Sequence, residues 1–202
     1  YCLQSFTYVK KRNMKKRILV GCLSLALASF TVNEIANWSL DKAHSRLGFT
    51  INHMGINDIH GEFKTFEVKA TTSTGSFEQA KIELTADVNS INTGISMRDD
   101  HLKTPDFFDA KKEPTLTFKS TSITKKDDKN YTVTGELEMR GIKKTVSFNA
   151  LHNGTAKNQS GKDVAGFRMT GWVKRTDFKV GDASPGLAEE VMLNADIEIV
   201  QE

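Results

Sequence analysis

A charged run followed by two adjacent phenylalanines is the stretch of this chain richest in reactive side chains. Arg98-Asp99-Asp100-His101 places two carboxylates beside an imidazole, and Phe107-Phe108 comes shortly afterwards. Acid–base catalysis needs such groups to converge on one substrate atom, whereas neighbouring residues of a helix or strand point in different directions. The chain also contains no Gly-x-Ser-x-Gly turn and no phosphate-binding P-loop. No catalytic residue is therefore predicted, and an enzyme that pairs one of these carboxylates with His53 or His101 is kept as an alternative.

The other histidines do not predict a metal site. His44, His60 and His152 are scattered along the chain, without an H-x-x-x-H pair, and the two cysteines, Cys2 and Cys22, both lie near the amino end. Zinc sites use closely spaced His and Cys ligands. We therefore predict neither a metal ion nor another cofactor.

The chain around these residues alternates apolar and polar side chains with the period of β-strands. One apolar face consists of Leu47, Phe49, Ile51 and His53, where the histidine is expected to be a hydrogen-bonded core residue. Short connections between the alternating segments predict antiparallel hairpins. The alternating segments number about eight and cover 45–54, 61–70, 81–88, 115–121, 131–139, 145–150, 167–173 and 191–200.

About eight antiparallel strands predict an all-β fold, either a sandwich or a closed barrel. A barrel of this size is wide enough to be filled by side chains or to hold one small ligand. Gly48, Gly135 and Gly171 stand among large residues in these segments. Such small residues are compatible with an internal cavity and equally with tight bends, and alternation alone leaves both open.

Residues 96–109 interrupt the alternation and predict a short helical excursion. Ser96 is expected to cap a turn over 97–103, and Thr104-Pro105 to begin a second, because proline is tolerated at the first helical position.

Two arginines are expected to form buried ion pairs, since a buried guanidinium needs a carboxylate partner. Arg98 is predicted to pair with Asp99 or Asp100 and so hold the excursion against the barrel, and Arg175 to pair with Asp177.

The amino end resembles an export signal. Met14-Lys15-Lys16-Arg17 is a basic start, 18–25 is apolar, and Ala26-Leu27-Ala28 offers small residues for cleavage. We therefore expect 1–13 to be an upstream, non-native segment, 14–28 a signal peptide and 29–202 the exported domain. In a second interpretation, less favoured because the apolar run before it is short, Cys22 is a lipoprotein anchor.

Net charge gives no reason to expect a nucleic-acid partner. Residues 1–28 hold six of the 28 basic residues and no acidic one, which leaves 22 basic against 25 acidic residues in the rest of the chain. The basic balance of the whole sequence therefore belongs to the targeting segment.

Several short motifs, in order, are similar to those of the YceI-like family over residues 38 to about 199. Lys179 departs from the pattern, because the family commonly has glycine directly after the phenylalanine that is Phe178 here. The motifs include Trp38-Ser39-Leu40-Asp41, His53-Met54-Gly55, Gly61-Glu62-Phe63, Ser90-Ile91-Asn92-Thr93-Gly94, Arg98-Asp99-Asp100-His101-Leu102-Lys103, Phe107-Phe108-Asp109, Arg140-Gly141 and Arg175-Thr176-Asp177-Phe178.

This resemblance implies a lipocalin-like antiparallel barrel, exported to the bacterial periplasm, with a long apolar pore. It implies a carrier or sequestering protein, not an enzyme, for a polyisoprenoid, an isoprenoid quinone or a fatty-acid derivative. A packed barrel that serves as an interaction module for a membrane redox partner is a further alternative, and a homodimer is left open. The residues expected to line the pore are Phe49, Ile51, His53, Arg98, His101, Phe107, Phe108, Phe118, Leu137, Met139, Phe148, Phe167 and Met169.

Overall fold

The computed structural model describes residues 35–73 and 76–202, all within the unit Asn33–Glu202. The predicted segments 1–13 and 14–28, the anchor at Cys22 and the start of the exported domain at 29 lie outside these residues. No helix among the described residues is long and apolar enough to cross a membrane. The elements are β1 (Ile35–Leu40), η1 (Lys42–His44), β2 (Arg46–His53), β3 (Asn57–Phe63), β4 (Phe66–Ser73), β5 (Ser76–Asp87), η2 (Val88–Ser90), β6 (Ile91–Asn92), α1 (Ser96–Leu102), β7 (Thr115–Lys125), β8 (Asn130–Met139), β9 (Ile142–Lys157), β10 (Asp163–Lys174), η3 (Arg175–Phe178) and β11 (Leu187–Gln201).

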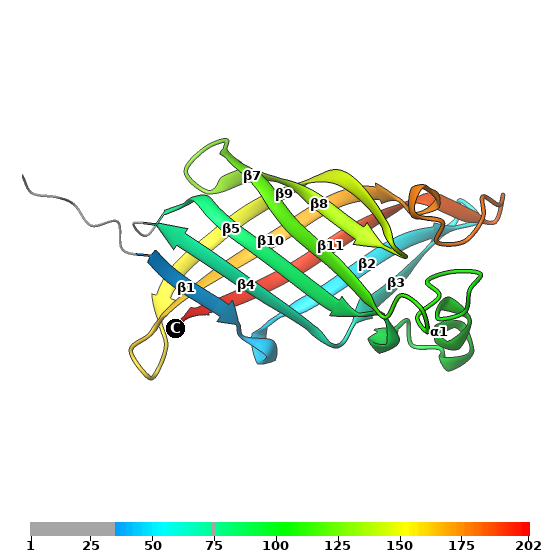
Figure 1. Cartoon of the computed structure of the whole chain (residues 1–202), viewed down its shortest axis with the longest axis horizontal. Helices are drawn as coiled ribbons and strands as arrows, with labels where there is room; N and C mark the ends of the chain where they lie inside the picture. Colours follow the sequence, from blue (N-terminus) through cyan, green and yellow to red (C-terminus); the bar gives the residue numbers. More distant parts are fainter. Residues whose placement is uncertain (1–34, 74–75) are drawn as a thin grey trace, which may run out of the picture. The chain divides into compact units, whose positions relative to one another are not determined.

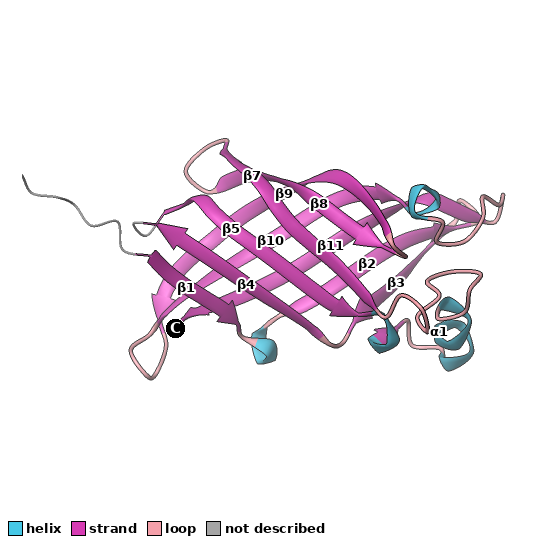
Figure 2. Cartoon of the chain, in the orientation of Figure 1, coloured by secondary structure: helices cyan, strands magenta, loops and turns pink. Residues whose placement is uncertain are grey.

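The strands form one antiparallel sheet that closes into a barrel (Figures 1 and 2), which confirms the predicted all-β fold. Eight strands make the ring, in the order β1-β4-β5-β7-β8-β9-β10-β11, and β1 pairs back onto β11. The 15-residue strand β11 has two partners on the same side. Its last residues pair with β1, with Leu40 opposite Ile199, and its earlier part pairs with β2, with Leu193 opposite Phe49. Strands β3 and β6 continue the sheet from β2.

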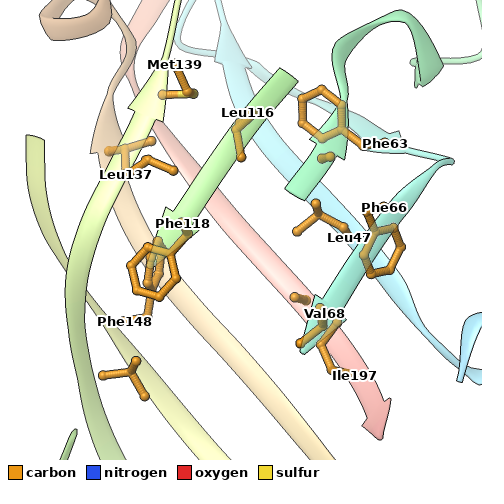
Figure 3. Close-up of a cluster of buried hydrophobic side chains, with 14 of the residues drawn as sticks. Leu47, Phe63, Phe66, Val68, Leu116, Phe118, Leu137, Met139, Phe148 and Ile197 are labelled. Carbon is orange, nitrogen blue, oxygen red and sulfur yellow. The ribbon is translucent and has the colours of Figure 1, made fainter. Parts of the chain in front are cut away.

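The apolar face of each strand points into the barrel, as the alternation predicts. In β8, Tyr131, Val133, Gly135, Leu137 and Met139 are buried, and the residues that alternate with them are more exposed. In Figure 3 Phe118 of β7 and Phe148 of β9 lie against one another, with ring centroids 5.3 Å apart. Side chains of these three neighbouring strands thus meet inside the barrel.

The glycines on the strands provide room for aromatic rings of adjacent strands. A Cβ on Gly135 would lie 2.5 Å from the ring of Phe118, and one on Gly171 would lie 2.4 Å from the ring of Phe148. A Cβ on Gly48 would instead meet the side chains of Arg46 and Asn194. At these three positions a side chain would meet its neighbours, so the glycines add no open space of their own.

Strand β1 lies at the end of the barrel opposite to α1 (Figure 1), and an aromatic cluster surrounds its Trp38. The Trp38 indole N–H donates to Thr72 Oγ1 at 3.1 Å, and its ring lies 5.4 Å from Phe77. Phe77 packs edge-on against Phe167 at 4.9 Å, and Phe167 stacks on His152 at 4.8 Å. Partial burial among these rings lowers the pKa of His152, because it disfavours the charged imidazolium.

The predicted helical excursion is present, but its start and its second half differ from the expectation. Ile95, not Ser96, occupies the N-cap position, and no side chain caps the helix. The carboxylate of Asp99, in the first turn, instead accepts from Thr93. Thr104-Pro105 begins a turn rather than a second helix, because the chain folds back on α1 through hydrogen bonds to the carbonyl oxygens of 102 and 103.

Candidate ligand-binding cavities

Two apolar cavities lie inside the barrel. The first, the inner cavity, has a volume of about 110 Å³. Tyr131 is the residue with a polar side-chain group in its wall; Asn194 also borders the cavity, but its amide faces outward and accepts from Arg46. The wall consists of Leu47, Val68, Ala70, Phe77, Ile82, Leu84, Leu116, Phe118, Ile123, Tyr131, Val133, Leu137, Phe148, Ala150, Phe167, Met169, Leu193, Asn194, Ala195, Ile197 and Ile199.

The second, the α1-side cavity, is larger and has polar groups on its wall. Its volume is about 320 Å³. Strand β2, the helix α1, the turn that follows α1 and the region around η3 all contribute to it. The wall consists of Phe49, Ile51, His53, Ile59, Phe63, Thr93, Arg98, His101, Leu102, Phe107, Phe108, Leu116, Met139, Val173, Arg175, Val180, Leu187, Val191 and Leu193.

The two cavities adjoin within the barrel. Leu116 of β7 and Leu193 of β11 belong to both walls. An apolar chain that enters the α1-side cavity and passes between these two side chains would reach the inner cavity. The two cavities are therefore neighbours, the inner one apolar and the α1-side one with polar groups on its wall.

All thirteen residues predicted to line a pore lie on one of these walls; their contact with a ligand stays a prediction. The inner cavity takes Phe118, Leu137, Phe148, Phe167 and Met169. The α1-side cavity takes Phe49, Ile51, His53, Arg98, His101, Phe107, Phe108 and Met139.

Arg98 and Asp99 are joined through Thr93, so the predicted direct ion pair is wrong. Arg98 Nε donates to Thr93 Oγ1 at 2.7 Å, and Nη2 donates to the Thr93 carbonyl at 2.8 Å. The Thr93 hydroxyl and N–H both donate to Asp99 Oδ1, at 2.6 and 2.8 Å. Since Asp99 is only 7% exposed, these bonds satisfy a nearly buried carboxylate. Thr93 therefore fixes α1 to the segment before it, and Asp100 forms an exposed pair with Lys103.

Arg175 also lacks the carboxylate partner predicted for it. The side chain is 4% exposed and is held by backbone carbonyl oxygens of the chain between η3 and β11. This is possible because a guanidinium has five donors, which can be satisfied by neutral acceptors. Burial lowers the pKa of Arg175, and the nearby carboxylates of Glu189 and Asp182 oppose that shift. Nε donates to Ala188 at 2.9 Å, Nη1 to Val180 at 2.9 Å, and Nη2 to Asp182 at 3.0 Å and Leu187 at 3.3 Å.

The segment after η3 adopts the backbone conformation that the family pattern implies for glycine. Lys179 has a φ of 56°, in the left-handed region, at the position where the family commonly has glycine. Arg140 donates to the carbonyl oxygens of Lys179 and Pro105. One side chain thus links this segment to the turn after α1, on two sides of the α1-side cavity.

The histidines of the α1-side cavity are not arranged with the carboxylates that the enzyme alternative requires. His101 packs edge-on against Phe107 at 5.0 Å, and its Nε2 lies 3.5 Å from Asp106. Asp99 is held by Thr93 and Asp100 by Lys103, as described above. His53 is exposed rather than a hydrogen-bonded core residue, because β2 ends there at the hairpin turn.

Asp41, His44 and Glu198 bring three possible metal-ligand atoms within 4.8 Å of one another, away from the cavities. His44 Nδ1 lies 2.9 Å from Asp41 and 3.8 Å from Glu198. The hydrogen bond between His44 and Asp41 raises the pKa of His44 and lowers that of Asp41. This group could not be predicted, because Glu198 is far from Asp41 and His44 in the sequence. Exposed acidic groups of this kind are common without an ion.

Sequence reasoning missed several residues of the cavity walls. Leu116 and Leu193 occupy apolar positions of the alternating segments 115–121 and 191–200, but nothing in the sequence marks them as shared by two cavities. Thr93 belongs to the family motif Ser90-Ile91-Asn92-Thr93-Gly94, but the motif does not show that Thr93 joins Arg98 to Asp99. Arg175 was noticed for its charge, but its carbonyl partners depend on the path of the chain after η3.

The chain is similar to a known family over most of its length. A model of the YceI-like domain matches residues 38–199. Protein YceI of Salmonella arizonae is 31% identical over 94% of this chain and 100% of its own length. A UPF0312 protein of Pseudomonas putida is 34% identical over 92% of this chain and 96% of its own length.

Solved structures share the barrel. A YceI protein of Campylobacter jejuni has 35% identity and a TM-score of 0.69, over 81% of this chain and 96% of that one. A polyisoprenoid binding domain from Saccharophagus degradans has 15% identity and a TM-score of 0.59, over 82% and 98% of the two chains. At that identity the second likeness shows the fold alone.

Proposed function

This chain belongs to the YceI-like family, and from that premise we propose that it binds a long-chain amphiphile inside the barrel. Its role is that of a carrier or a sequestering protein in the bacterial periplasm. The ligand is a polyisoprenoid, an isoprenoid quinone or a fatty-acid derivative. The polyisoprenoid binding named for the Saccharophagus degradans domain supports the first of these classes.

The observation that carries the proposal is the distribution of polar groups along the two adjoining cavities. The inner cavity has an almost entirely apolar wall, whereas Arg98, His101 and Thr93 lie on the wall of the α1-side cavity. A volume of about 320 Å³ falls within the range of small-molecule sites. The arrangement fits a ligand with an apolar tail in the barrel and a polar head group near α1.

The tail contributes more to affinity than the head group. Burying a methylene contributes about 0.8 kcal/mol, so ten of them contribute roughly 8 kcal/mol. A hydrogen bond to a charged group contributes about 1.5–3 kcal/mol. Because Nε and Nη2 of Arg98 are already engaged by Thr93, Arg98 adjusts the preference for head groups rather than setting affinity.

The proposed role is binding without catalysis. No histidine of the α1-side cavity is paired with Asp99 or Asp100 in the part of the chain that the structure describes, and the partner of His101 is the exposed Asp106. Location in the periplasm is supported by the signal-like residues 14–28.

The test is to purify the protein without detergent, extract it with organic solvent and identify the released lipid by mass spectrometry. Delipidated protein is then titrated with a fluorescent polyene fatty acid. Met169→Arg places a charge on the wall of the inner cavity, whereas the matched control Thr170→Arg changes the next residue of β10, which points to the other face. We expect a long-chain lipid in the extract, and saturable binding that Met169→Arg abolishes and Thr170→Arg retains. An extract without lipid, together with no saturable binding by delipidated protein, would refute the proposal.

A further inference from the structure

Large apolar side chains are exposed at the α1 end of the barrel. Met54 and Ile56 lie in the turn between β2 and β3, and are 61% and 82% exposed. Ile95 and Met97 lie at the start of α1, and are 53% and 83% exposed. Exposed apolar side chains that gather in one region mark a surface that contacts another molecule or a membrane.

These side chains belong to segments that border the α1-side cavity. The turn 54–57 follows His53, and the segment 93–97 begins with Thr93, both of which are on the cavity wall. A third segment, 183–188, contains the wall residue Leu187. The first and third are joined directly, because the Met54 N–H donates to the Gly186 carbonyl at 3.1 Å.

The three segments carry no charge. Residues 54–57 read MGIN, 93–97 read TGISM and 183–188 read ASPGLA, without Lys, Arg, Asp or Glu, in a chain that is 26% charged. We call these segments together the uncharged rim. Uncharged segments that carry exposed Ile and Met side chains suit the boundary between headgroups and acyl chains, where apolar side chains become buried. The charged residues Asp58, Arg98 and Asp182 directly flank these segments.

We propose that the uncharged rim docks on the surface of a lipid bilayer with neutral, zwitterionic headgroups. Met54, Ile56 and Met97 enter the headgroup region, and the α1-side cavity then opens towards the membrane. The purpose of this docking rests on the proposed function, because a ligand with a long apolar tail is held in membranes and must leave one to enter the barrel. The docking itself is measurable without any ligand.

A bilayer fits this surface better than a protein partner does. The exposed apolar side chains stand in pairs on two separate segments, and Asn57, Ser96 and Ser184 are polar residues of the same rim. A fluid bilayer accommodates such separate side chains, whereas a protein interface needs a contiguous, closely packed apolar centre. Because the rim has no charge, the attraction is hydrophobic and is not screened by salt.

The test is flotation of the purified protein with phosphatidylcholine vesicles at low and at high salt. We expect binding that is the same at both salt concentrations. Ile56→Ser and Met97→Ser each weaken partitioning about tenfold, since burial of one such side chain corresponds to at least one factor of ten. Ile35→Ser is the matched control, because Ile35 is 67% exposed in β1, a strand that has no part in the rim; it leaves vesicle binding unchanged.

Titration of the delipidated variants with the fluorescent fatty acid, without vesicles, separates the two proposals. Rim variants that bind the fatty acid normally but take it up slowly from vesicles support docking. Wild-type protein that docks on vesicles but binds no fatty acid contradicts the proposed function and leaves docking intact. A wild-type protein that does not float with vesicles overturns the docking proposal; this result is expected if the rim contacts a protein instead. So does a loss of flotation in Ile35→Ser equal to that in the rim variants.

Discussion

Removal of the Thr93 hydroxyl is expected to release α1 from the barrel. Thr93→Val keeps the shape of the side chain but removes the donor to Asp99 and the acceptor for Arg98 Nε, at 2.6 and 2.7 Å. Hydrogen bonds to charged groups contribute about 1.5–3 kcal/mol each. The backbone of Thr93 still binds both partners, and Arg98 is only half-buried. We therefore expect the free energy that holds α1 in place to fall by about 2–4 kcal/mol, which is less than the sum of two complete hydrogen bonds to charged groups.

This loss is expected to act locally. The Thr93 hydrogen bonds connect α1 only to the segment before it, whereas β8 and β9 are held together by a continuous ladder. Amide hydrogen exchange followed by mass spectrometry should accelerate roughly 30- to 1000-fold in peptides covering 96–103, as 1.4 kcal/mol corresponds to a factor of ten. Exchange in β8 and β9 should change much less.

Thr121→Val is the matched control for this experiment. The Thr121 hydroxyl donates to the Thr134 carbonyl at 3.2 Å on the exposed surface. Its loss removes one neutral hydrogen bond far from α1 and should leave amide exchange at 96–103 unchanged. Wild-type exchange at 96–103 in Thr93→Val would refute the assignment of Thr93 as the residue that fixes α1.

Three further predictions concern the barrel. Arg175→Met leaves four backbone carbonyl oxygens without their donor, and thermal unfolding should show a loss of more than about 3 kcal/mol. Gly135→Ala forces a Cβ to within 2.5 Å of the Phe118 ring and 2.3 Å of the Lys119 carbonyl oxygen, so urea unfolding should show a loss of about 1–3 kcal/mol. Burial lowers the pKa of His152 in the folded state. The stability that neutral His152 contributes is therefore fully present above the pKa of about 6.5 that it has in the unfolded chain, and it is lost as the pH falls through the pKa of the folded state. NMR titration should place that folded pKa below the usual histidine value.

Each of these predictions has a control. Arg168→Met removes an exposed ion pair with Asp196 and should cost less than about 1 kcal/mol; an equal loss in Arg175→Met would contradict the role given to its carbonyl partners. Gly166→Ala has no atom nearer than 3.7 Å to the new Cβ and should be tolerated. Equal losses of stability in Gly166→Ala and Gly135→Ala would show that contact with the Phe118 ring does not cause the effect of Gly135→Ala. The pKa of His44 is raised by Asp41, so a His152 that titrates as high as His44 would contradict the effect of burial.

The barrel could be predicted because strand alternation is a local signal. The inward positions of β8 and β11 follow from a period of two, and nine of the thirteen predicted pore residues occupy such strand positions. These nine lie on cavity walls because the closed sheet directs inward side chains towards the same space. The other four, Arg98, His101, Phe107 and Phe108, lie on the wall of the α1-side cavity from α1 and the turn after it.

The contacts of polar groups could not be predicted, because they depend on chain paths that the sequence does not show. A buried arginine was expected to require a carboxylate. Arg175 is instead surrounded by a chain segment that turns its carbonyl oxygens inward, and Arg98 meets Asp99 only through Thr93. Likewise, an inward position suggested that His53 is buried, but the strand ends there and the side chain lies at the cavity wall near the turn.

The account depends most on the claim that the apolar tail of a ligand occupies the inner cavity. The direct measurement is the affinity of delipidated protein for a series of saturated fatty acids of increasing length, in the wild type and in Met169→Trp, which fills part of that cavity. Affinity should rise up to about fourfold per methylene until the inner cavity is full, and Met169→Trp should stop the rise at a shorter chain. Affinity that does not depend on chain length, or a limit that is the same in both proteins, would contradict the claim.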